Sequence, residues 1–471
     1  MRKFCRLIGN EWKKQFRKKA AWVMMILLAV LAVGYSMIIA FESTSSVDYW
    51  YAYSEEEYRW QIEENETGAQ EVDKHGNPTE YAKQCQLNVE YYQFLLDHEM
   101  FAYDWRMDLV SEMFYVARSN GDTARFEELK AIVEGNDTVA YFNDMRAQYE
   151  REYAADPEAL AILVWKPDYC IAHDIYPSDT DWRYERVTTV TNDRYVVLMK
   201  ERQLAEGKES EDDLAALEKA RNRAAIAMYQ LENDIEVNPA DSLQTSILTG
   251  NAGDSGFWNA FVCSKDLVSV IGLFVIVIAG SIVSNEYSQG TIKFLLINPV
   301  KRWKILMSKY ATAMLIGALM LAILLVCSFV SSLIFGGASE AFLPAIKAEG
   351  GVVKTFSPYL SLLGAYLLAA VEVVVMATLA FAISALLRSS APAIGISLFA
   401  YLGGTLLVTL LKELGFDWAR YLLFANLNFS SIVNGTSSFA HQSIVTAIVV
   451  VVLHMVVFLL TAWDAFCRKE V

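Results

Sequence analysis

A run of 22 uncharged and mostly apolar residues near the N-terminus, residues 20–41, constrains this chain more than any other feature. At a rise of about 1.5 Å per residue, a helix of this length spans the hydrocarbon core of a bilayer, which is roughly 30 Å thick. A cleaved signal peptide is the alternative, but its apolar region usually has about 7–15 residues and ends at a small-residue cleavage site. This run is longer and no such site closes it, so we expect a retained transmembrane helix.

Five further apolar runs are long enough to cross a membrane. They cover residues 267–284, 310–335, 360–387, 391–411 and 443–462. The sequence therefore predicts an all-α membrane protein with six transmembrane helices and a large domain between the first and second helices. The expected division is a cytoplasmic amphipathic elbow (residues 1–19), the first span (20–41), an extracellular domain (42–261) and a bundle of the remaining five spans (262–471).

Charge separates the large domain from the rest of the chain. The whole chain has a formal net charge of −15, yet residues 42–261 alone hold 45 acidic and 19 basic side chains, a charge of −26. The remaining residues therefore carry +11. An acidic domain attached to basic membrane segments explains how a chain that is 54% hydrophobic is also strongly acidic.

The short loops that alternate between the two sides of the membrane differ in their basic residues, which sets the orientation. On the side of both termini there are 16 Lys and Arg, against four in the short loops opposite. These four are Lys347, Lys354, Lys412 and Arg420. Both termini are therefore expected in the cytoplasm of a multi-pass cell-membrane protein, with residues 42–261 outside.

The large domain has the periodicity of helices. Apolar residues recur at steps of three, four or seven between Leu214 and Ile235, which is typical of one face of an amphipathic helix. Breaks between helices are expected at residues 76–78, 120–122, 156–157 and 238–239, where Gly, Asn, Asp and Pro gather. Residues 187–190 and 195–199 are candidates for short strands. About 220 residues suffice for a core of their own.

The chain offers little for catalysis, metal binding or cofactor binding. It has no G-x-x-x-x-G-K-[ST] phosphate loop, no H-E-x-x-H and no G-x-S-x-G, so ATP hydrolysis by a phosphate loop is excluded for this chain. Its six cysteines include no C-x-x-C pair. Only Cys85 and Cys170 lie well inside the large domain. They are either a disulfide or, more commonly at such a separation, two buried thiols.

The most informative segment follows the second span, at residues 285–302 (NEYSQGTIKFLLINPVKR). Gly290 permits a sharp turn, and Thr291 is a suitable N-cap for a short helix over residues 292–297. Pro299 then ends that helix. Basic residues of the segment, Lys293 and Arg302 among them, are expected to hold it at the membrane surface near anionic lipid. We expect a short, stiff helix that lies across the membrane surface and transmits force into two spans. A plain basic loop is the alternative.

The pattern E-x-x-x-G-T-x-K-x-L-L-x-x-P-x-x-R in this segment resembles that of the type-two ABC exporter permeases of bacteria. Residues 7–14 (LIGNEWKK) resemble the elbow helix that precedes the first span in that family. The resemblance covers the elbow and the six spans, roughly half of the chain. The large domain between the first two spans departs from the shortest members of the family and leaves the substrate open.

The resemblance implies a function and its partners. It implies the permease subunit of an ATP-driven exporter, without bond chemistry of its own, that pairs with a second permease and with two separate cytoplasmic ATPase subunits. The coupling helix would dock on the ATPase, which assigns this role to Glu286, Gly290, Thr291, Lys293, Pro299 and Arg302. Membrane lipid is a further partner, and neither nucleic acid nor a cofactor is expected.

Glu372 is the one acidic residue in the middle of an expected span, where an ionised carboxylate is costly. It is either a substrate or proton site in the transport pathway or a hydrogen-bonded structural residue, and the second is more common.

Two other classes of function remain as alternatives. One is a ligand-binding membrane sensor or scaffold, although the expected cytoplasmic segments are short for a signalling domain. The other is a membrane enzyme with an external site, for which the sequence supplies no nucleophile and base motif.

Overall fold

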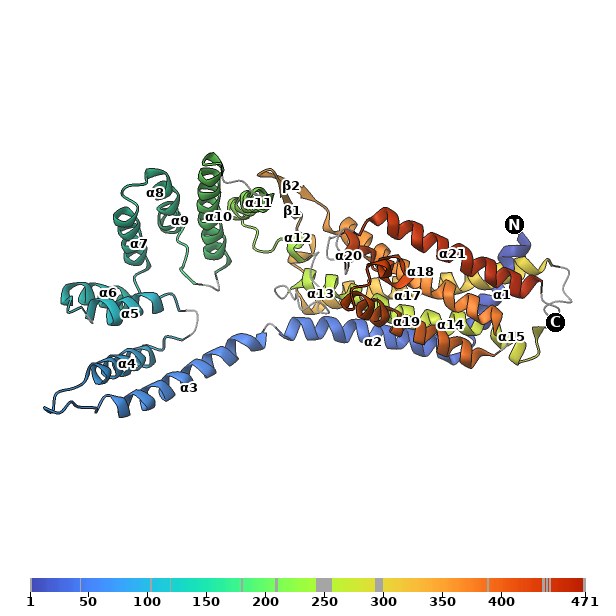
Figure 1. Ribbon diagram of the computed structural model, residues 1–471, viewed down its shortest axis with the longest axis horizontal. Helices are drawn as coiled ribbons and strands as arrows, with labels where there is room; N and C mark the ends of the chain where they lie inside the picture. Colours follow the sequence, from blue (N-terminus) through green and yellow to red (C-terminus); the bar gives the residue numbers. More distant parts are fainter. Residues whose placement is uncertain are drawn as a thin grey trace. The chain divides into compact units, whose positions relative to one another are not determined.

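The computed structural model describes the chain with several short gaps. The described residues are 2–42, 44–101, 104–118, 120–178, 181–207, 211–242, 256–292, 300–387, 389–433, 437, 439 and 442–468. They fold into two compact units. The membrane unit comprises Met1–Phe41, Asp241–Phe342 and Ser357–Val471, and the helical unit comprises Glu42–Ala240 and Leu343–Phe356. Figure 1 shows the helices of both units with their labels.

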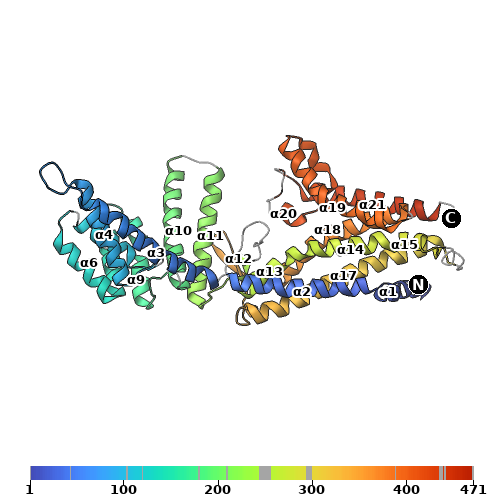
Figure 2. The same cartoon turned by 90° about the horizontal axis from the view of Figure 1, so that it is seen from below.

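Six helical segments in the membrane unit are long and apolar enough to cross a membrane, which confirms the expected all-α fold with six spans. They are Lys19–Ile39, Phe257–Ile282, Arg302–Phe335, Pro358–Leu386, Ser390–Glu413 and Ile444–Cys467. The helices that form them are α2 (Lys19–Glu42), α13 (Phe257–Cys263) with α14 (Val268–Ile282), α17 (Arg302–Phe335), α18 (Pro358–Leu386), α19 (Ser390–Glu413) and α21 (Ile444–Cys467). Most of these helices run alongside one another in both views (Figure 1 and Figure 2).

The second span begins ten residues before the predicted start at residue 267. Phe257 and Trp258 are fully buried in the core of the membrane unit. The Phe257 N–H donates to the Glu340 carboxylate at 3.0 Å, and the Trp258 indole N–H donates to the Glu340 carbonyl at 2.8 Å. Burial of two aromatic side chains and these hydrogen bonds extend the helix beyond its apolar run.

Helix α14 forms the centre of the bundle and is packed by α17, α18 and α19. It is buried along most of its length, as expected for a helix that is apolar on all sides. Its glycines allow close approach, because a Cβ at Gly280 would lie 3.1 Å from Ile394 and one at Gly272 would lie 3.3 Å from the Tyr401 hydroxyl. By contrast, α19 and α21 expose many large apolar side chains, which suits helices that face lipid.

Shorter elements complete the membrane unit. They are α1 (Arg2–Phe16), the 3₁₀ turn Ser264–Leu267, α15 (Ser284–Ser288), the 3₁₀ turns Glu340–Phe342, Asp417–Tyr421 and Leu423–Asn426, and α20 (Phe429–Val433). Helix α1 packs on α17, with Glu11 and Gln15 buried in the contact. It lies within residues 1–19, for which the elbow helix is a prediction.

The helical unit is built from helices of four to 25 residues, the last of which crosses the boundary of the unit at Ala240. They are α3 (Thr44–Gly68), α4 (Glu80–Asp97), α5 (Met107–Glu112) with the π-helical turn Met113–Arg118, α6 (Thr123–Gly135), α7 (Thr138–Glu152), α8 (Pro157–Leu163), α9 (Trp165–Ala172), α10 (Trp182–Ala205), α11 (Glu211–Asn233) and α12 (Pro239–Ser242). Asp122 and Asp156 cap α6 and α8 at two of the predicted breaks, because each carboxylate accepts a backbone N–H of the first turn. A core of aromatic and aliphatic side chains joins α4 to α7, α9 and α10.

The two candidate strands at residues 187–190 and 195–199 are wrong. Both lie inside the continuous helix α10, whose buried residues Val187, Val190 and Thr191 follow helical spacing. The β-branched residues that suggested strands pack on one face of this helix instead. Tertiary packing thus outweighs local strand propensity.

The only sheet among the described residues is an antiparallel hairpin of β1 (Ala345–Glu349) and β2 (Val352–Phe356), which was not among the predicted elements. The hairpin lies between α17 and α18 in the chain but belongs to the helical unit, where it packs on α11. The helical unit therefore ends at Ala240, earlier than the boundary at residue 261 expected from the apolar pattern, and gains a second chain segment.

The two cysteines of the helical unit are both free and buried. Cys170 lies in the aromatic core, whereas Cys85 lies on α4 beside Gly68. The structure therefore agrees with two buried thiols rather than a disulfide.

Candidate functional site

The end of α14 is anchored to α18 before the chain enters the segment that carries the sequence motif. The backbone N–H groups of Val283 and Ser284 both donate to the Ser384 hydroxyl, at 3.2 and 3.1 Å. The Ser284 hydroxyl in turn donates to the Gly280 carbonyl at 2.8 Å. These contacts compensate for the interruption between α14 and α15 and fix the direction in which α15 leaves the bundle.

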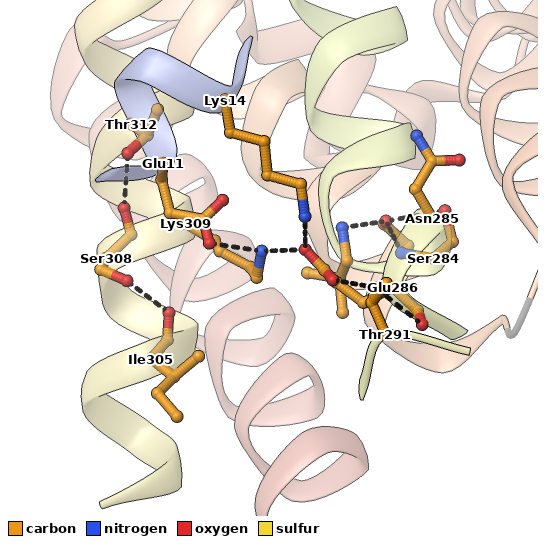
Figure 3. A network of polar contacts seen from close by, with 12 residues as sticks. Glu11, Lys14, Ser284, Asn285, Glu286, Thr291, Ile305, Ser308, Lys309 and Thr312 are labelled. Carbon is orange, nitrogen blue, oxygen red and sulfur yellow. Dashed lines mark hydrogen bonds and ion pairs between the residues drawn. The ribbon is translucent and has the colours of Figure 1, made fainter. Parts of the chain in front are cut away.

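Glu286 of α15 is buried, with only 2% of its surface exposed. Its carboxylate accepts hydrogen bonds from the ammonium groups of Lys14 and Lys309 and from the Thr291 hydroxyl (Figure 3). The Lys309 contact measures 2.8 Å. A buried carboxylate is stable only when it is paired and hydrogen-bonded, and Glu286 meets both conditions.

Lys309 lies on α17 and is completely buried. Its ammonium group lies between two carboxylates, those of Glu11 on α1 and Glu286 on α15, each at 2.8 Å. Figure 3 shows these side chains meeting from three separate elements. One oxygen of Glu11 is buried without a hydrogen-bond partner among the described residues. We call Glu11, Lys14, Glu286, Thr291 and Lys309 the ion cluster.

The electrostatics of the ion cluster favour its charged form. Burial raises the pKa of the Glu286 carboxyl, but the nearby Lys309 charge and the hydrogen bonds from Lys14, Lys309 and Thr291 outweigh burial and lower it to about 2. The pKa of Lys18, next to the cluster, is lowered by burial and by repulsion from Lys14 and Lys309. The cluster therefore holds Glu286 ionised at neutral pH. Its two ammonium groups disfavour a further positive charge at Lys18.

The turn after α15 has the geometry that the sequence indicated. Gly290 has φ = 70°, a left-handed conformation that glycine adopts without steric cost, and its N–H donates to the Tyr287 carbonyl at 3.1 Å. Thr291 follows, and its hydroxyl donates to the Glu286 carboxylate. The first turn of the helix that it was predicted to cap lies almost entirely outside the described residues. The turn is thus tied to the ion cluster.

The other residues assigned to coupling are only partly described. Arg302 is the exposed first residue of α17. Lys293 and Pro299 lie outside the described residues, as does most of the short helix predicted over residues 292–297. We call residues 286–302 the coupling segment. The structure describes both of its ends and not its centre.

Glu372 lies on α18, away from the ion cluster, and is half-buried. It forms a side-chain hydrogen bond with Tyr401 of α19, and the Tyr401 hydroxyl also lies 3.3 Å from the Ser269 carbonyl, to which it can donate. These contacts join α18 and α19 to the N-terminal end of the central α14 segment. They match the hydrogen-bonded structural reading of Glu372, and its role in transport stays a prediction.

Sequence reasoning singled out Glu286 and Thr291 but not their charged partners Glu11, Lys14 and Lys309. Lys14 is separated from Glu286 by 272 positions in the sequence, and Glu11 from Lys309 by 298 positions. No local pattern reveals pairs at such separations. The signal that was present is indirect, because Glu11 and Lys14 are three residues apart in the elbow segment and so lie on one helical face.

The described residues contain no group of three or more His, Cys, Asp or Glu side chains that could hold a metal ion. The ion cluster itself has two carboxylates and two ammonium groups, a combination that forms salt bridges rather than a cation site. Its chemistry is therefore mechanical linkage between helices.

Comparison with known proteins places this region in a family. A family profile described as "Protein of unknown function (DUF2705)" matches residues 244–471. The chain is 36% identical over 223 residues to "Uncharacterized protein YhcI" of Bacillus subtilis (strain 168), which covers 46% of this chain and 71% of that protein. It is 31% identical over 219 residues to "Uncharacterized membrane protein YdbK" of the same organism, which covers 46% of this chain and 85% of that protein. The matched family region includes Glu286 and Lys309.

Proposed function

The chain belongs to the DUF2705 family, and we propose that it is the permease subunit of an ATP-binding-cassette exporter. It is a multi-pass membrane protein with six candidate spans. In the proposed orientation both termini and the segment between α15 and α17 face the cytoplasm, and the helical unit lies outside. The excess of Lys and Arg in the cytoplasmic loops supports this orientation.

The observation that carries the proposal is the ion cluster. Through Glu286 and Lys309 it links α1, the start of the segment between α15 and α17, and α17 itself. A partner that pushes on this segment would therefore move the elbow helix and a span together rather than bend a free loop. This is the connection that an exporter needs between a cytoplasmic motor and its membrane helices.

The proposed mechanism assigns the chain no bond chemistry. A separate ATPase subunit binds and hydrolyses ATP, and its closure displaces the segment that begins at Glu286 and ends at Arg302. Gly290 and Thr291 set the direction of the segment, and Lys293, Pro299 and Arg302 lie within it or at its end. The displacement passes through the ion cluster to α1 and α17, and through Ser384 to α18. A second permease would complete the transport pathway.

The test is the isolation of the native complex. A tagged chain is expressed together with the product of the neighbouring gene, solubilised in mild detergent and purified by its tag. We expect a phosphate-loop ATPase to purify with it in a fixed ratio. The variant Lys13→Met changes an exposed position of α1 and should leave the ratio of ATPase to chain unchanged. A chain that purifies reproducibly without any ATPase, and binds an extracellular ligand instead, would favour the sensor or scaffold reading.

A further inference from the structure

The β1–β2 hairpin has a two-residue turn that fixes the direction of every backbone group in both strands. Gly350 and Gly351 have φ values of 59° and 80°, as a type I′ turn requires. The flanking residues Glu349 and Val352 are paired. In such a hairpin the flanking residues form a hydrogen-bonded pair, and hydrogen-bonded and non-hydrogen-bonded pairs then alternate along the ladder.

This alternation makes the two outer edges of the hairpin predictable. On β1 it directs the N–H and C=O of Ile346 outward, and the Asn238 side chain meets both of them, at 2.8 and 3.1 Å. The β1 edge is therefore occupied at this position by a side-chain amide that imitates a neighbouring strand. The contact also confirms the register.

On β2 the same alternation directs the N–H and C=O groups of Val353 and Thr355 outward. Within the described part of the chain, neither residue has a hydrogen-bond partner on this side. Lys354 does not cover the edge, because its ammonium group is paired with Glu349 of β1 at 2.9 Å. The β2 edge thus presents two residues that are ready to pair with another strand.

A groove of about 550 Å³ lies beside β2, between α10, α11 and the hairpin. Its floor includes Val197 and Leu198 of α10 and Ala224 and Met228 of α11, and Val353 contributes the wall on the hairpin side. Figure 1 shows the hairpin next to α11. Arg221 and Glu201 pair with each other at the rim, at 2.7 Å.

The hairpin is held firmly against α11, so the groove is a built feature. The Gly351 N–H donates to the Asn222 side chain at 2.8 Å, and a Cβ at Gly351 would lie 3.2 Å from Arg221. Ile346 and Ala348, on the same face of the hairpin as Val353, are buried. A strand added beside β2 would continue this face over the apolar floor.

We propose that the β2 edge and the adjoining groove bind an extended peptide segment by strand addition. The peptide backbone pairs with Val353 and Thr355, and every second side chain enters the groove, which selects apolar residues at alternate positions. A lipid chain or a compact apolar molecule would fill the groove but would leave the backbone groups of the edge unpaired. The proposal concerns the helical unit alone and stands whether or not the chain is a permease.

The test uses the full-length chain in lipid nanodiscs and a fluorescent octapeptide with valine at every second position, threonine between and a lysine at each end. Fluorescence anisotropy measures its binding. We expect saturable binding that is lost for the same peptide with N-methylated amides at the positions that face β2. The two peptides have the same side chains and charge, so the difference reports on strand pairing.

The variant Val353→Pro removes the outward N–H without removing a hydrogen bond to β1, which edge strands tolerate. It should weaken peptide binding about tenfold or more, since about 1.4 kcal/mol corresponds to a factor of ten. Met228→Glu, which places a charge in the floor, should weaken it by a similar factor. Val352→Thr, on the exposed opposite face, is the control and should change binding less than about twofold.

Three results would overturn the proposal. The first is no saturable binding of the octapeptide by the wild-type chain. The second is equal binding of the N-methylated peptide, which would mean that charge or hydrophobicity alone drives association. The third is wild-type affinity in both Val353→Pro and Met228→Glu when both variants elute from gel filtration like the wild type.

Discussion

Lys309 is the residue on which the ion cluster depends most. It is fully buried and shares its charge between Glu11 and Glu286. Lys309→Met removes that charge and leaves two buried carboxylates with Lys14 as the remaining cation of the cluster. Loss of one member of a buried ion pair costs about 3–5 kcal/mol.

We therefore expect Lys309→Met to lower the midpoint of thermal unfolding of the purified protein clearly, and to lower its yield. Lys13→Met, which removes an exposed charge from the same helix as Glu11 and Lys14, is the matched control and should leave both unchanged. Equal midpoints for the two variants would mean that the cluster contributes nothing to the stability of the bundle.

The pKa of Glu286 gives the cluster a pH dependence with a definite sign. Its folded-state pKa of about 2 lies below its ordinary value of 4.5, so the fold stabilises the ionised form. This contribution is complete above about pH 4.5 and is lost as the pH falls toward about 2. Glu286→Gln lacks the contribution at every pH.

The difference in unfolding midpoint between wild type and Glu286→Gln should therefore be constant from pH 7 to pH 5 and shrink between pH 4.5 and the lowest pH at which the protein remains soluble. Differential scanning fluorimetry in nanodiscs measures it. A difference that grows as the pH falls would contradict the assigned direction of the pKa.

Substitutions at Glu372 distinguish a structural role of this residue from a role in transport. Its hydrogen bond with Tyr401 joins α18 to α19. Glu372→Gln keeps the size and hydrogen-bonding capacity of the side chain and should be tolerated, whereas Glu372→Leu leaves the Tyr401 hydroxyl without this partner and should reduce protein yield. Tyr401→Phe should leave export unchanged. Loss of export in well-expressed Glu372→Gln protein would assign the carboxylate a direct role instead.

At the scale of elements, the spans were predictable because a run of about 20 apolar residues has few other uses. The residues at which the spans begin and end were less predictable. The second span begins at Phe257, since aromatic burial and contacts with Glu340 extend it, and these depend on a loop more than 80 positions away. The helix α10 was partly misread because Val and Thr favour strands locally, although its buried positions follow helical spacing.

The hairpin and the ion cluster show a different limit of sequence reasoning. Gly350 and Gly351 are a recognisable turn signal, but the short strands around them gain their stability from α11, more than 100 positions earlier. Glu286 was predicted from a motif, whereas its pairing with Lys14 and Lys309 depends on how three helices assemble. Contacts of this kind follow from the fold and leave no local pattern.

At the scale of the whole molecule, the orientation in the membrane can be tested directly. In a cysteine-free variant, Glu150→Cys in the helical unit should react with a membrane-impermeant thiol reagent in intact cells. Lys301→Cys, just before α17, should react only after the cells are opened. Both positions are exposed. The reverse pattern would contradict the proposed topology.

The turn at Gly290 connects the orientation to the proposed transport role. No described residue lies within 4 Å of a Cβ at this position, so Gly290→Val acts on the described turn through backbone strain. Gly290→Asn is the matched variant, because Asn adopts the left-handed conformation more readily. Gly290→Val therefore strains the left-handed turn more than Gly290→Asn does. The strain changes the direction in which the coupling segment leaves the membrane unit.

ATP turnover by the purified complex of this chain with its ATPase subunit, reconstituted in nanodiscs, compares wild type with these two variants. We expect turnover to fall about fivefold or more in Gly290→Val, within the range of coupling between protein sites, while Gly290→Asn retains most of it and all three proteins insert equally. Turnover at the wild-type level in Gly290→Val, and also in Glu286→Ala and Arg302→Ala, would contradict the assignment of this chain as a permease driven through that segment.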